Sequence, residues 1–300
     1  MIFVRRDIIR PTAQDARAAV AEFLLTAAFM ASVFSLVRWG IGTMAPGASA
    51  AELRVRVAAV SASVGVLIVG FAVSRPGRFS GAHMNPAITL GLFAAGAVPA
   101  RRVLPYLAAQ VSGSIVAAML ARLLWGPSVG EEPVKWAVVQ PGNGWSGWAV
   151  AAAEAATLAA IVAVMCAVKN RRPRWPLAWI VGALFGLQGA ILGTLSGGSA
   201  NPARQLGPAL FSGDVHLLIV YLVAPVAGAM LAGHIATGHR LRHPSRIEDF
   251  GPAAPGPAAR AQAEAVDQAE VVPVVAGLGG VHRRSQEVER SCGSARRSPW

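Results

Sequence analysis

The sequence predicts an all-α membrane protein with six transmembrane helices and two re-entrant half-helices, built from an inverted three-helix repeat. Three observations predict this fold: an apolar composition, a series of separated apolar stretches, and a tripeptide that occurs twice. Of the 300 residues, 54% are hydrophobic and 14% are charged, whereas soluble domains carry about 25% charged residues. The composition therefore excludes an ordinary soluble protein.

Six apolar stretches reach the roughly 20 residues that a helix needs to cross a bilayer. They are residues 18–37, 57–74, 103–121, 148–168, 176–195 and 217–238. Two further stretches, 86–95 and 202–211, reach only about half of that length. Each follows a glycine-rich turn, SGAHM or SGGSA. We interpret these two as re-entrant half-helices, whose backbone is tolerated only where it faces protein or water.

The basic residues predict the orientation of the chain. With the N-terminus inside, fifteen Lys and Arg residues fall in the inner segments and six in the outer loops, as the positive-inside rule requires. We therefore expect a multi-pass protein of the plasma membrane with both termini in the cytoplasm. The formal net charge of +12 belongs to loops that face lipid headgroups, so nucleic acid is not an expected partner.

The spans and loops divide the chain into five segments. Residues 1–17 form a cytoplasmic arm, 18–124 the first repeat, 125–147 an extracellular connecting loop, 148–240 the second repeat, and 241–300 a cytoplasmic tail. From about residue 247 the tail is rich in Ala, Pro and Gly. Such a composition cannot bury enough apolar surface to fold alone, so we expect the tail to be disordered.

Three sequence features recur in the two halves in the same order. Asn-Pro-Ala occurs at Asn85-Pro86-Ala87 and again at Asn201-Pro202-Ala203, and YLAAQVSG at 106–113 matches YLVAPVAG at 221–228. Each half also carries an acid early in its first span, Glu22 and Glu154. Because each half has an odd number of spans, the two must insert with opposite topology. The two half-helices are then expected to meet N-terminus to N-terminus near the midplane.

The two Asn-Pro pairs suit helix starts, because Asn is a favoured N-cap and Pro a favoured first helical residue. One interpretation is simply two well-capped helices. The functional interpretation is that the Asn85 and Asn201 amides donate to a passing oxygen atom, while the two helix N-termini place positive charge at the pore centre. Neutral molecules would then pass, and protons and cations would be opposed.

Arg204 follows the second tripeptide directly. A charge in a membrane segment is costly and usually marks a pathway. The alternative is a structural role in which Arg204 pairs with Asp214 or with loop carbonyls.

The segments SGAHMNPAITL (80–90) and GGSANPARQLGPAL (197–210) resemble the two signature loops of the major intrinsic proteins, the aquaporin and aquaglyceroporin channels. The resemblance covers about residues 18–240. It implies a homotetramer in the lipid bilayer with one pore per subunit, passing water and small neutral solutes. It implies no cofactor, and the sequence shows no metal-ligand spacing.

The resemblance also implies the residues of a selectivity filter beside Arg204. They are Gly189, Gly198 and a residue of the second span, which is Ala62, one of its neighbours, or Gly65. Water-selective members carry His at the first position and an aromatic residue in the second span, and both are absent here. The filter resembles that of the wide-pore nodulin-26-like members. Gln205 stands where glycerol facilitators usually have Asp, which is evidence against a plain glycerol facilitator. The resemblance as a whole implies passage of water with small polyols or neutral metalloid hydroxides.

Three polar residues have two interpretations each. Glu22 and Glu154 resemble the family's paired glutamates, which support the re-entrant loops, although they could instead couple protons in a transporter. His83 is expected to line the inner vestibule or to make a polar loop contact. The rivals to a passive channel are a secondary active transporter and a non-conducting scaffold or adhesion protein. An enzyme is not expected, because no nucleophile–base pair or metal cluster can be assembled.

Overall fold

The computed structural model of this protein describes residues 10–242, and this part of the chain is helical without strands. The helices are α1 (Ala13–Gly40), α2 (Ala50–Val73), α3 (Arg75–Ser80), α4 (Pro86–Ala94), α5 (Ala100–Trp125), α6 (Gly147–Arg171), α7 (Leu177–Leu192), α8 (Pro202–Ser212) and α9 (Leu218–Arg242), with 3-10 turns η2 (Gly126–Val129) and η3 (Lys135–Ala137). The predicted arm up to residue 9 and the tail from residue 243 lie outside the described residues.

The predicted elements are present in the predicted order. Helices α1, α2, α5, α6 and α9 are each long and apolar enough to cross a membrane. Helix α7 has 16 residues, or about 24 Å at 1.5 Å per residue, and is shorter than the predicted span. It ends at Gly193 because the chain then turns into the bundle through a segment in which Gly197 and Gly198 have positive φ. The six-span interpretation is confirmed, with one short member.

Helix α1 begins five residues before the predicted span, so the end of the predicted arm is helical. Thr12 and Asp15 form a reciprocal capping box at its start, which satisfies N–H groups that would otherwise lack partners. The Asp15 carboxylate also forms ion pairs with Arg101 and Arg102 at the start of α5. These contacts fix the first turn of α1 against the neighbouring span.

Helix α3 was not predicted. It lies between the predicted second span and the glycine-rich turn, and it has the residues of a short helix: Ser74 caps it, Pro76 stands in its first turn, and Gly81 ends it at φ +100°. This turn of helix directs the chain from α2 towards the centre of the bundle.

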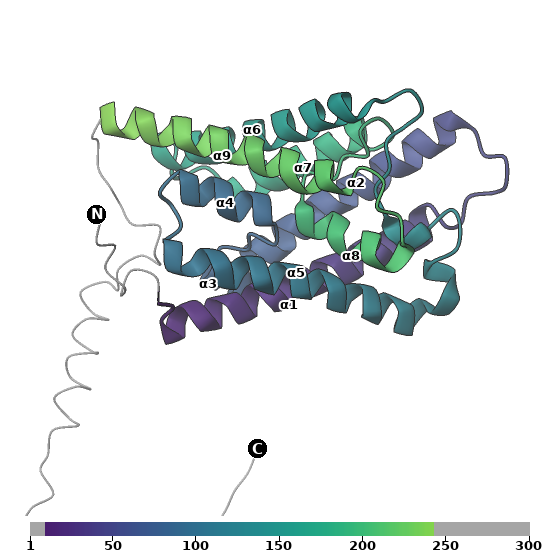
Figure 1. The fold of residues 1–300 in the computed structure, drawn as a ribbon, viewed down its shortest axis with the longest axis horizontal. Helices are drawn as coiled ribbons and strands as arrows, with labels where there is room; N and C mark the ends of the chain where they lie inside the picture. The colour runs from purple at the N-terminus through teal and green to yellow at the C-terminus, as the bar shows by residue number, and fades with distance from the viewer. Residues whose placement is uncertain (1–9, 243–300) are drawn as a thin grey trace, which may run out of the picture. The chain divides into compact units, whose positions relative to one another are not determined.

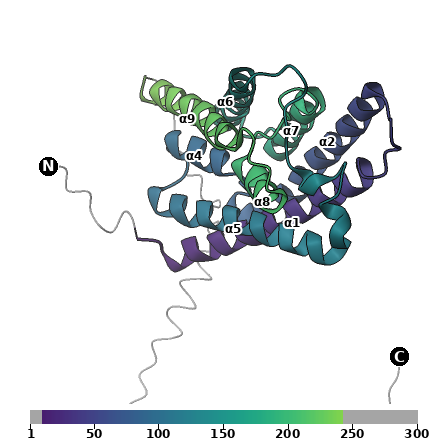
Figure 2. The ribbon, with the colours of Figure 1, turned by 45° about the vertical axis from the view of Figure 1, so that its right-hand side comes forward.

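The helices pack in pairs, and several of these pairs combine one helix from each repeat (Figure 1). Within each repeat the first and third spans lie together, as α1 with α5 and α6 with α9, while the second spans α2 and α7 pack across the repeats. The half-helix α4 of the first repeat packs on α9 of the second, and α8 packs on α5. Figure 2 shows α4 and α8 between α5 and α9. The crossed packing makes the two repeats one unit.

Glycine permits the closest helix contacts. A Cβ atom added at Gly228 of α9 would lie 1.9 Å from the Ala155 carbonyl oxygen of α6. One added at Gly65 of α2 would lie 2.5 Å from the Gly182 carbonyl oxygen of α7. Without a hydrophobic driving force between helices in lipid, such close backbone approach supplies much of the packing energy.

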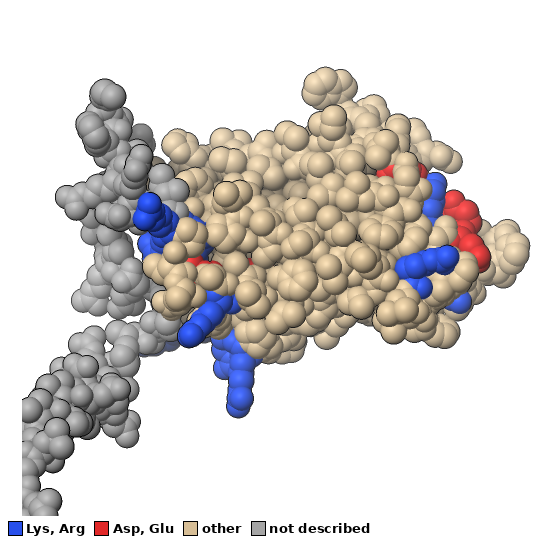
Figure 3. Space-filling view, turned by 60° about the horizontal axis from the view of Figure 1, so that its bottom comes forward, with Lys and Arg blue, Asp and Glu red and all other residues tan. Residues whose placement is uncertain are grey.

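Charged side chains gather at the two ends of the helices. On the face shown in Figure 3, Lys, Arg, Asp and Glu lie at either end and leave an uncharged band between them. Large apolar side chains such as Leu104, Leu123 and Ile219 are exposed in this part of the chain. An uncharged, apolar perimeter fits the hydrocarbon core of a bilayer, so this is an integral membrane protein.

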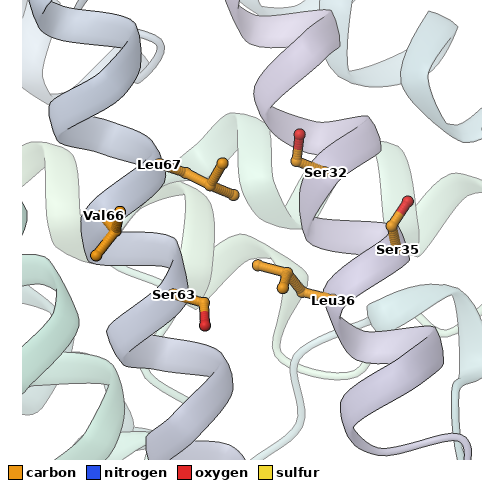
Figure 4. A pocket seen from close by; sticks show the side chains of 6 residues that line it. All are labelled: Ser32, Ser35, Leu36, Ser63, Val66 and Leu67. Carbon is orange, nitrogen blue, oxygen red and sulfur yellow. The ribbon is translucent and has the colours of Figure 1, made fainter.

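A groove of about 470 Å³ lies on the outside of the bundle between α1 and α2 (Figure 4). Ser32, Ser35 and Ser63 line it together with Leu36, Val66 and Leu67. The three hydroxyls donate to the carbonyl oxygens of Ala28, Ala31 and Ala59 on their own helices. Because these donors already have partners, the groove presents a mainly apolar surface.

Replacing Gly65 by Ala should destabilise the protein by about 1–3 kcal/mol, the usual cost of overpacking, because the added methyl group meets backbone. Gly70→Ala on the same helix is the matched control, since a Cβ there meets nothing within 4 Å. Thermal unfolding in detergent should show a lower melting temperature for Gly65→Ala only. Equal melting temperatures for the two variants would contradict the close contact between α2 and α7.

Candidate pore

One cavity of about 780 Å³ runs along the inside of the bundle. At one end it is lined by Arg78 of α3 and Lys169 near the end of α6, and at the other by Leu53 near the start of α2. Asn85 and Asn201 lie on its wall between these ends. The cavity therefore has wall residues near both charged ends of the helices and passes Asn85 and Asn201 between them.

Each Asn caps its half-helix as predicted. The Asn85 side-chain oxygen accepts hydrogen bonds from the backbone N–H groups of Ala87 at 2.9 Å and Ile88 at 3.4 Å. The Asn201 oxygen likewise accepts from Ala203 and Arg204, at 2.9 and 3.3 Å. Pro86 and Pro202 stand first in the two helices, where the missing N–H costs nothing.

The Asn amide nitrogens connect the two repeats. Asn85 Nδ2 donates to the Ala200 carbonyl oxygen, and Asn201 Nδ2 donates to the Met84 carbonyl oxygen, both at 2.9 Å. Each carboxamide has two N–H groups, so one remains on each side chain, and both residues line the cavity. A capping role alone would not need these crossed bonds or the exposure to the cavity.

Glu22 supports the first re-entrant loop. Its carboxylate accepts hydrogen bonds from the Ser80 hydroxyl at 2.7 Å and from the backbone N–H groups of His83 and Met84 at 2.9 and 2.8 Å. The Gln110 amide donates to it at 2.9 Å. Glu22 is fully buried and is not among the residues that line the cavity.

Glu154 supports the second re-entrant loop in the same way. It accepts hydrogen bonds from the Ser196 hydroxyl at 3.0 Å and from the backbone N–H groups of Ser199 and Ala200 at 3.2 and 2.6 Å. It too is fully buried and away from the cavity wall. Both acids therefore have the contacts of loop supports, and neither has the access to the cavity that proton coupling would need.

Both loops contain strained backbone next to the Asn residues. Met84 and Ala200 have φ of +47° and +49°, a left-handed conformation that costs a non-glycine residue about 1–2 kcal/mol. The N–H groups of these same two residues donate to Glu22 and Glu154. The buried acids thus hold the turns that direct the two Asn residues at each other.

Arg204 is held by a loop carbonyl while it lines the cavity. Its Nη1 donates to the Ala137 carbonyl oxygen at 2.8 Å. Asp214, the other predicted partner, lies 3.2 Å from the Lys135 Nζ instead, and this hydrogen bond raises the pKa of Lys135. A guanidinium has five N–H donors, so the bond to Ala137 leaves others for a molecule in the cavity.

Gln205 has a role that the sequence analysis missed. Its amide oxygen accepts from the Val139 N–H at 2.9 Å, and its amide nitrogen donates to the Val139 carbonyl at 3.0 Å. Gln205 is fully buried. This two-point bond attaches the loop after η3 to the half-helix α8, and thereby holds the Ala137 carbonyl beside Arg204.

The predicted filter positions have mixed outcomes. Gly189 and Gly198 line the cavity, but Ala62 and Gly65 do not. Ala62 is exposed on the outside of α2, and Gly65 lies where α2 and α7 cross. Of the alternatives predicted for the second span, Ala62 and Gly65 are therefore wrong as wall residues, whereas Ser61, a neighbour of Ala62, lines the cavity; its hydroxyl lies 2.7 Å from where a Gly189 Cβ would be.

His83 has both of its predicted contacts. It lines the cavity, its Nδ1 lies 3.0 Å from the Thr89 hydroxyl, and its ring meets the edge of Tyr106 at a centroid distance of 5.3 Å. It is therefore a wall residue that is also fixed by its loop contacts.

Comparison with known proteins identifies the family. The sequence model of the major intrinsic protein family matches residues 10–236. The chain belongs to this family. It is a passive channel for water and small solutes rather than an enzyme, and the transporter and scaffold alternatives are not favoured.

The relatives of this channel include bacterial and plant proteins. Aquaporin Z of Bradyrhizobium diazoefficiens is 32% identical over 67% of this chain and 87% of its own length. Aquaporin NIP1-4 of Oryza sativa is 31% identical over 69% and 72%. The propanediol uptake facilitator PduF of Citrobacter freundii is 32% identical over 54% and 72%. An X-ray structure of the aquaglyceroporin from Plasmodium falciparum has the same fold, with a TM-score of 0.62 at 21% identity, covering 77% of this chain and 98% of that chain.

Replacing Gln205 by Leu should lower the melting temperature in detergent, because the Val139 N–H and carbonyl lose their partner. A buried backbone group without a partner costs about 1–3 kcal/mol. Gln14→Leu is the matched control, since Gln14 is exposed in the first turn of α1 and surface changes are usually within about 0.5 kcal/mol. Equal melting temperatures for the two variants would contradict a stabilising role for the hydrogen bonds between Gln205 and Val139.

Proposed function

We propose that this channel passes water together with small uncharged hydroxylated solutes, such as polyols or neutral metalloid hydroxides, and excludes ions and protons. The observation that carries the proposal is the composition of the cavity wall around Arg204. Gly189, Gly198 and the small Ser61 line the cavity, and the resemblance to the family puts His at the position of Gly189 and an aromatic residue in the second span of the narrower, water-selective channels.

Hydroxyl-bearing solutes suit the polar groups at this constriction. The free N–H groups of Arg204 donate to a hydroxyl oxygen, and the Ser61 hydroxyl can both donate and accept. At the centre of the cavity, Asn85 and Asn201 each offer a further N–H group. A solute would thus exchange its water contacts for protein contacts twice along the path.

The charges of the cavity wall oppose cations. The charged residues among those that line it are Arg78, Lys169 and Arg204, all of them basic. The N-termini of α4 and α8 add positive partial charge where the two half-helices meet. Positive fields of this kind are the usual barrier to cations and protons in channels that pass neutral molecules.

We also propose a homotetramer in the plasma membrane with both termini in the cytoplasm. The start of α1 and the end of α9 lie at the same end of the helices (Figure 1), and the excess of basic residues supports placing that end inside. The serine-lined groove between α1 and α2 is a surface on which another copy could pack (Figure 4).

Stopped-flow light scattering on proteoliposomes tests the proposal with water, glycerol, urea and neutral arsenite. Faster water and glycerol flux than in protein-free vesicles, without proton leakage, is the expected result. Flux of water alone would contradict the proposed solute class, and uptake driven by a proton gradient would contradict passive conduction.

Gly189→His should reduce glycerol flux more than water flux, because the larger side chain enters the space beside Ser61. Gly70→Ala, on the exposed side of α2, is the control and should leave both fluxes unchanged. An equal loss of water and glycerol flux in Gly189→His would place the constriction elsewhere.

Arg204→Val should relax the exclusion of cations, because it removes the positive charge at the constriction. Sodium and proton leakage into vesicles, measured with fluorescent indicators, should rise above the level of the unaltered channel. Unchanged leakage in folded protein that still conducts water would remove Arg204 from this role.

A further inference from the structure

We propose that Gln188 is a specificity-determining residue of this channel, whose carboxamide hydrogen-bonds hydroxylated solutes as they pass Arg204. The inference rests on the proposed function and deepens it, since it names a further polar group of the constriction. Four observations on Gln188 carry it: its place on α7, its access to the cavity, an unpartnered nitrogen atom, and its contact with Gly198.

Gln188 is a polar residue in an otherwise apolar helix. Helix α7 has the sequence LAWIVGALFGLQGAIL, in which Gln188 carries the only carboxamide among apolar residues and glycines. A polar side chain in a membrane helix is costly unless it faces a cavity or a partner. Gln188 stands directly before Gly189 and lines the cavity.

The amide nitrogen of Gln188 is buried and has no hydrogen-bond partner within the described part of the chain. A buried donor without a partner costs about as much as a lost hydrogen bond, so native structures keep few of them. By contrast, the Asn85 and Asn201 amides at the centre of the cavity each donate to a carbonyl. The Gln188 nitrogen is thus an unused donor beside Gly198, and a rotation of the carboxamide would bring it to the cavity that Gln188 lines.

The contact with Gly198 explains how this amide comes to lie at the constriction. A Cβ atom added at Gly198 would lie 2.9 Å from the Gln188 Nε2, and Gly198 has φ +60°. The carboxamide therefore occupies space that a side chain at residue 198 would take. The absence of a side chain at residue 198 therefore admits an amide from the neighbouring helix to the wall of the cavity.

The chemistry of the amide complements that of Arg204. A guanidinium only donates hydrogen bonds, whereas a hydroxyl group both donates and accepts. The carboxamide of Gln188 has an acceptor oxygen and two N–H donors. Together with Ser61 it supplies the acceptors that a polyol needs when it exchanges its water shell for the wall of the pore.

Gln188→Leu tests the inference, because it keeps the approximate size of the side chain and removes the amide. We expect glycerol permeability to fall about five- to tenfold, as loss of one hydrogen bond implies, while water permeability changes less than twofold. The loss should be smaller for 1,2-propanediol, which has one hydroxyl fewer. Leu187→Ala is the matched control, since Leu187 is exposed on another face of α7.

The outcomes separate this inference from the proposed function. If the unaltered channel passes water but no glycerol, the proposed function fails. If it passes both, and Gln188→Leu leaves the ratio of glycerol to water permeability unchanged, the role of Gln188 is refuted. Should Gln188→Leu fold poorly, Gln188→Met provides the same comparison, because it keeps the length of the side chain and removes the amide without adding a charge: glycerol flux that falls relative to water flux supports the inference, and an unchanged ratio contradicts it.

Discussion

The structure depends on two crossed hydrogen bonds at the centre of the bundle. Each half-helix begins with an Asn whose amide reaches the carbonyl of the residue that precedes the other Asn. These bonds join two short helices from different repeats, neither of which could cross the membrane alone. Because the helix N-termini face each other, their positive ends add at one place. The same contact thus closes the fold and creates the field that a neutral-solute channel needs.

The crossed contact requires two turns that the backbone does not favour, and buried acids hold them. Glu22 and Glu154 accept hydrogen bonds from the backbone N–H groups of Met84 and Ala200, the residues with positive φ. Hydrogen bonds to a charged carboxylate are stronger than those between neutral groups, and they offset the cost of the backbone strain. The Tyr106 hydroxyl donates to the Ser80 carbonyl in the first repeat, and the Tyr221 hydroxyl donates to the Ser196 carbonyl in the second. The two repeats therefore hold their loops with equivalent contacts. The two halves differ directly after the tripeptide, because Arg204 and Gln205 follow the second copy whereas Ile88 and Thr89 follow the first.

The sequence predicted the arrangement of the chain but not the details of the cavity wall. Spans and half-helices follow from length and hydropathy, and the caps of α4 and α8 follow from Asn-Pro. The wall residue of α2 stayed open among Ala62, its neighbours and Gly65, because successive residues of a helix differ by about 100° in direction and the pattern alone does not say which of them faces the cavity. The structure places the neighbour Ser61 on the wall. The hydrogen bonds of Gln205 to Val139 and the contact of Gln188 with Gly198 join segments that are distant in the sequence or lie in different elements. Local sequence patterns do not encode such contacts.

An experimental density map of the protein in lipid, at a resolution that shows ordered water, tests the central claim most directly. The account predicts an unbroken file of water through the bundle, with one oxygen atom within hydrogen-bond distance of the Asn85 and Asn201 amides together. A map in which apolar side chains separate the two amides, or in which the water file ends before reaching them, would contradict it.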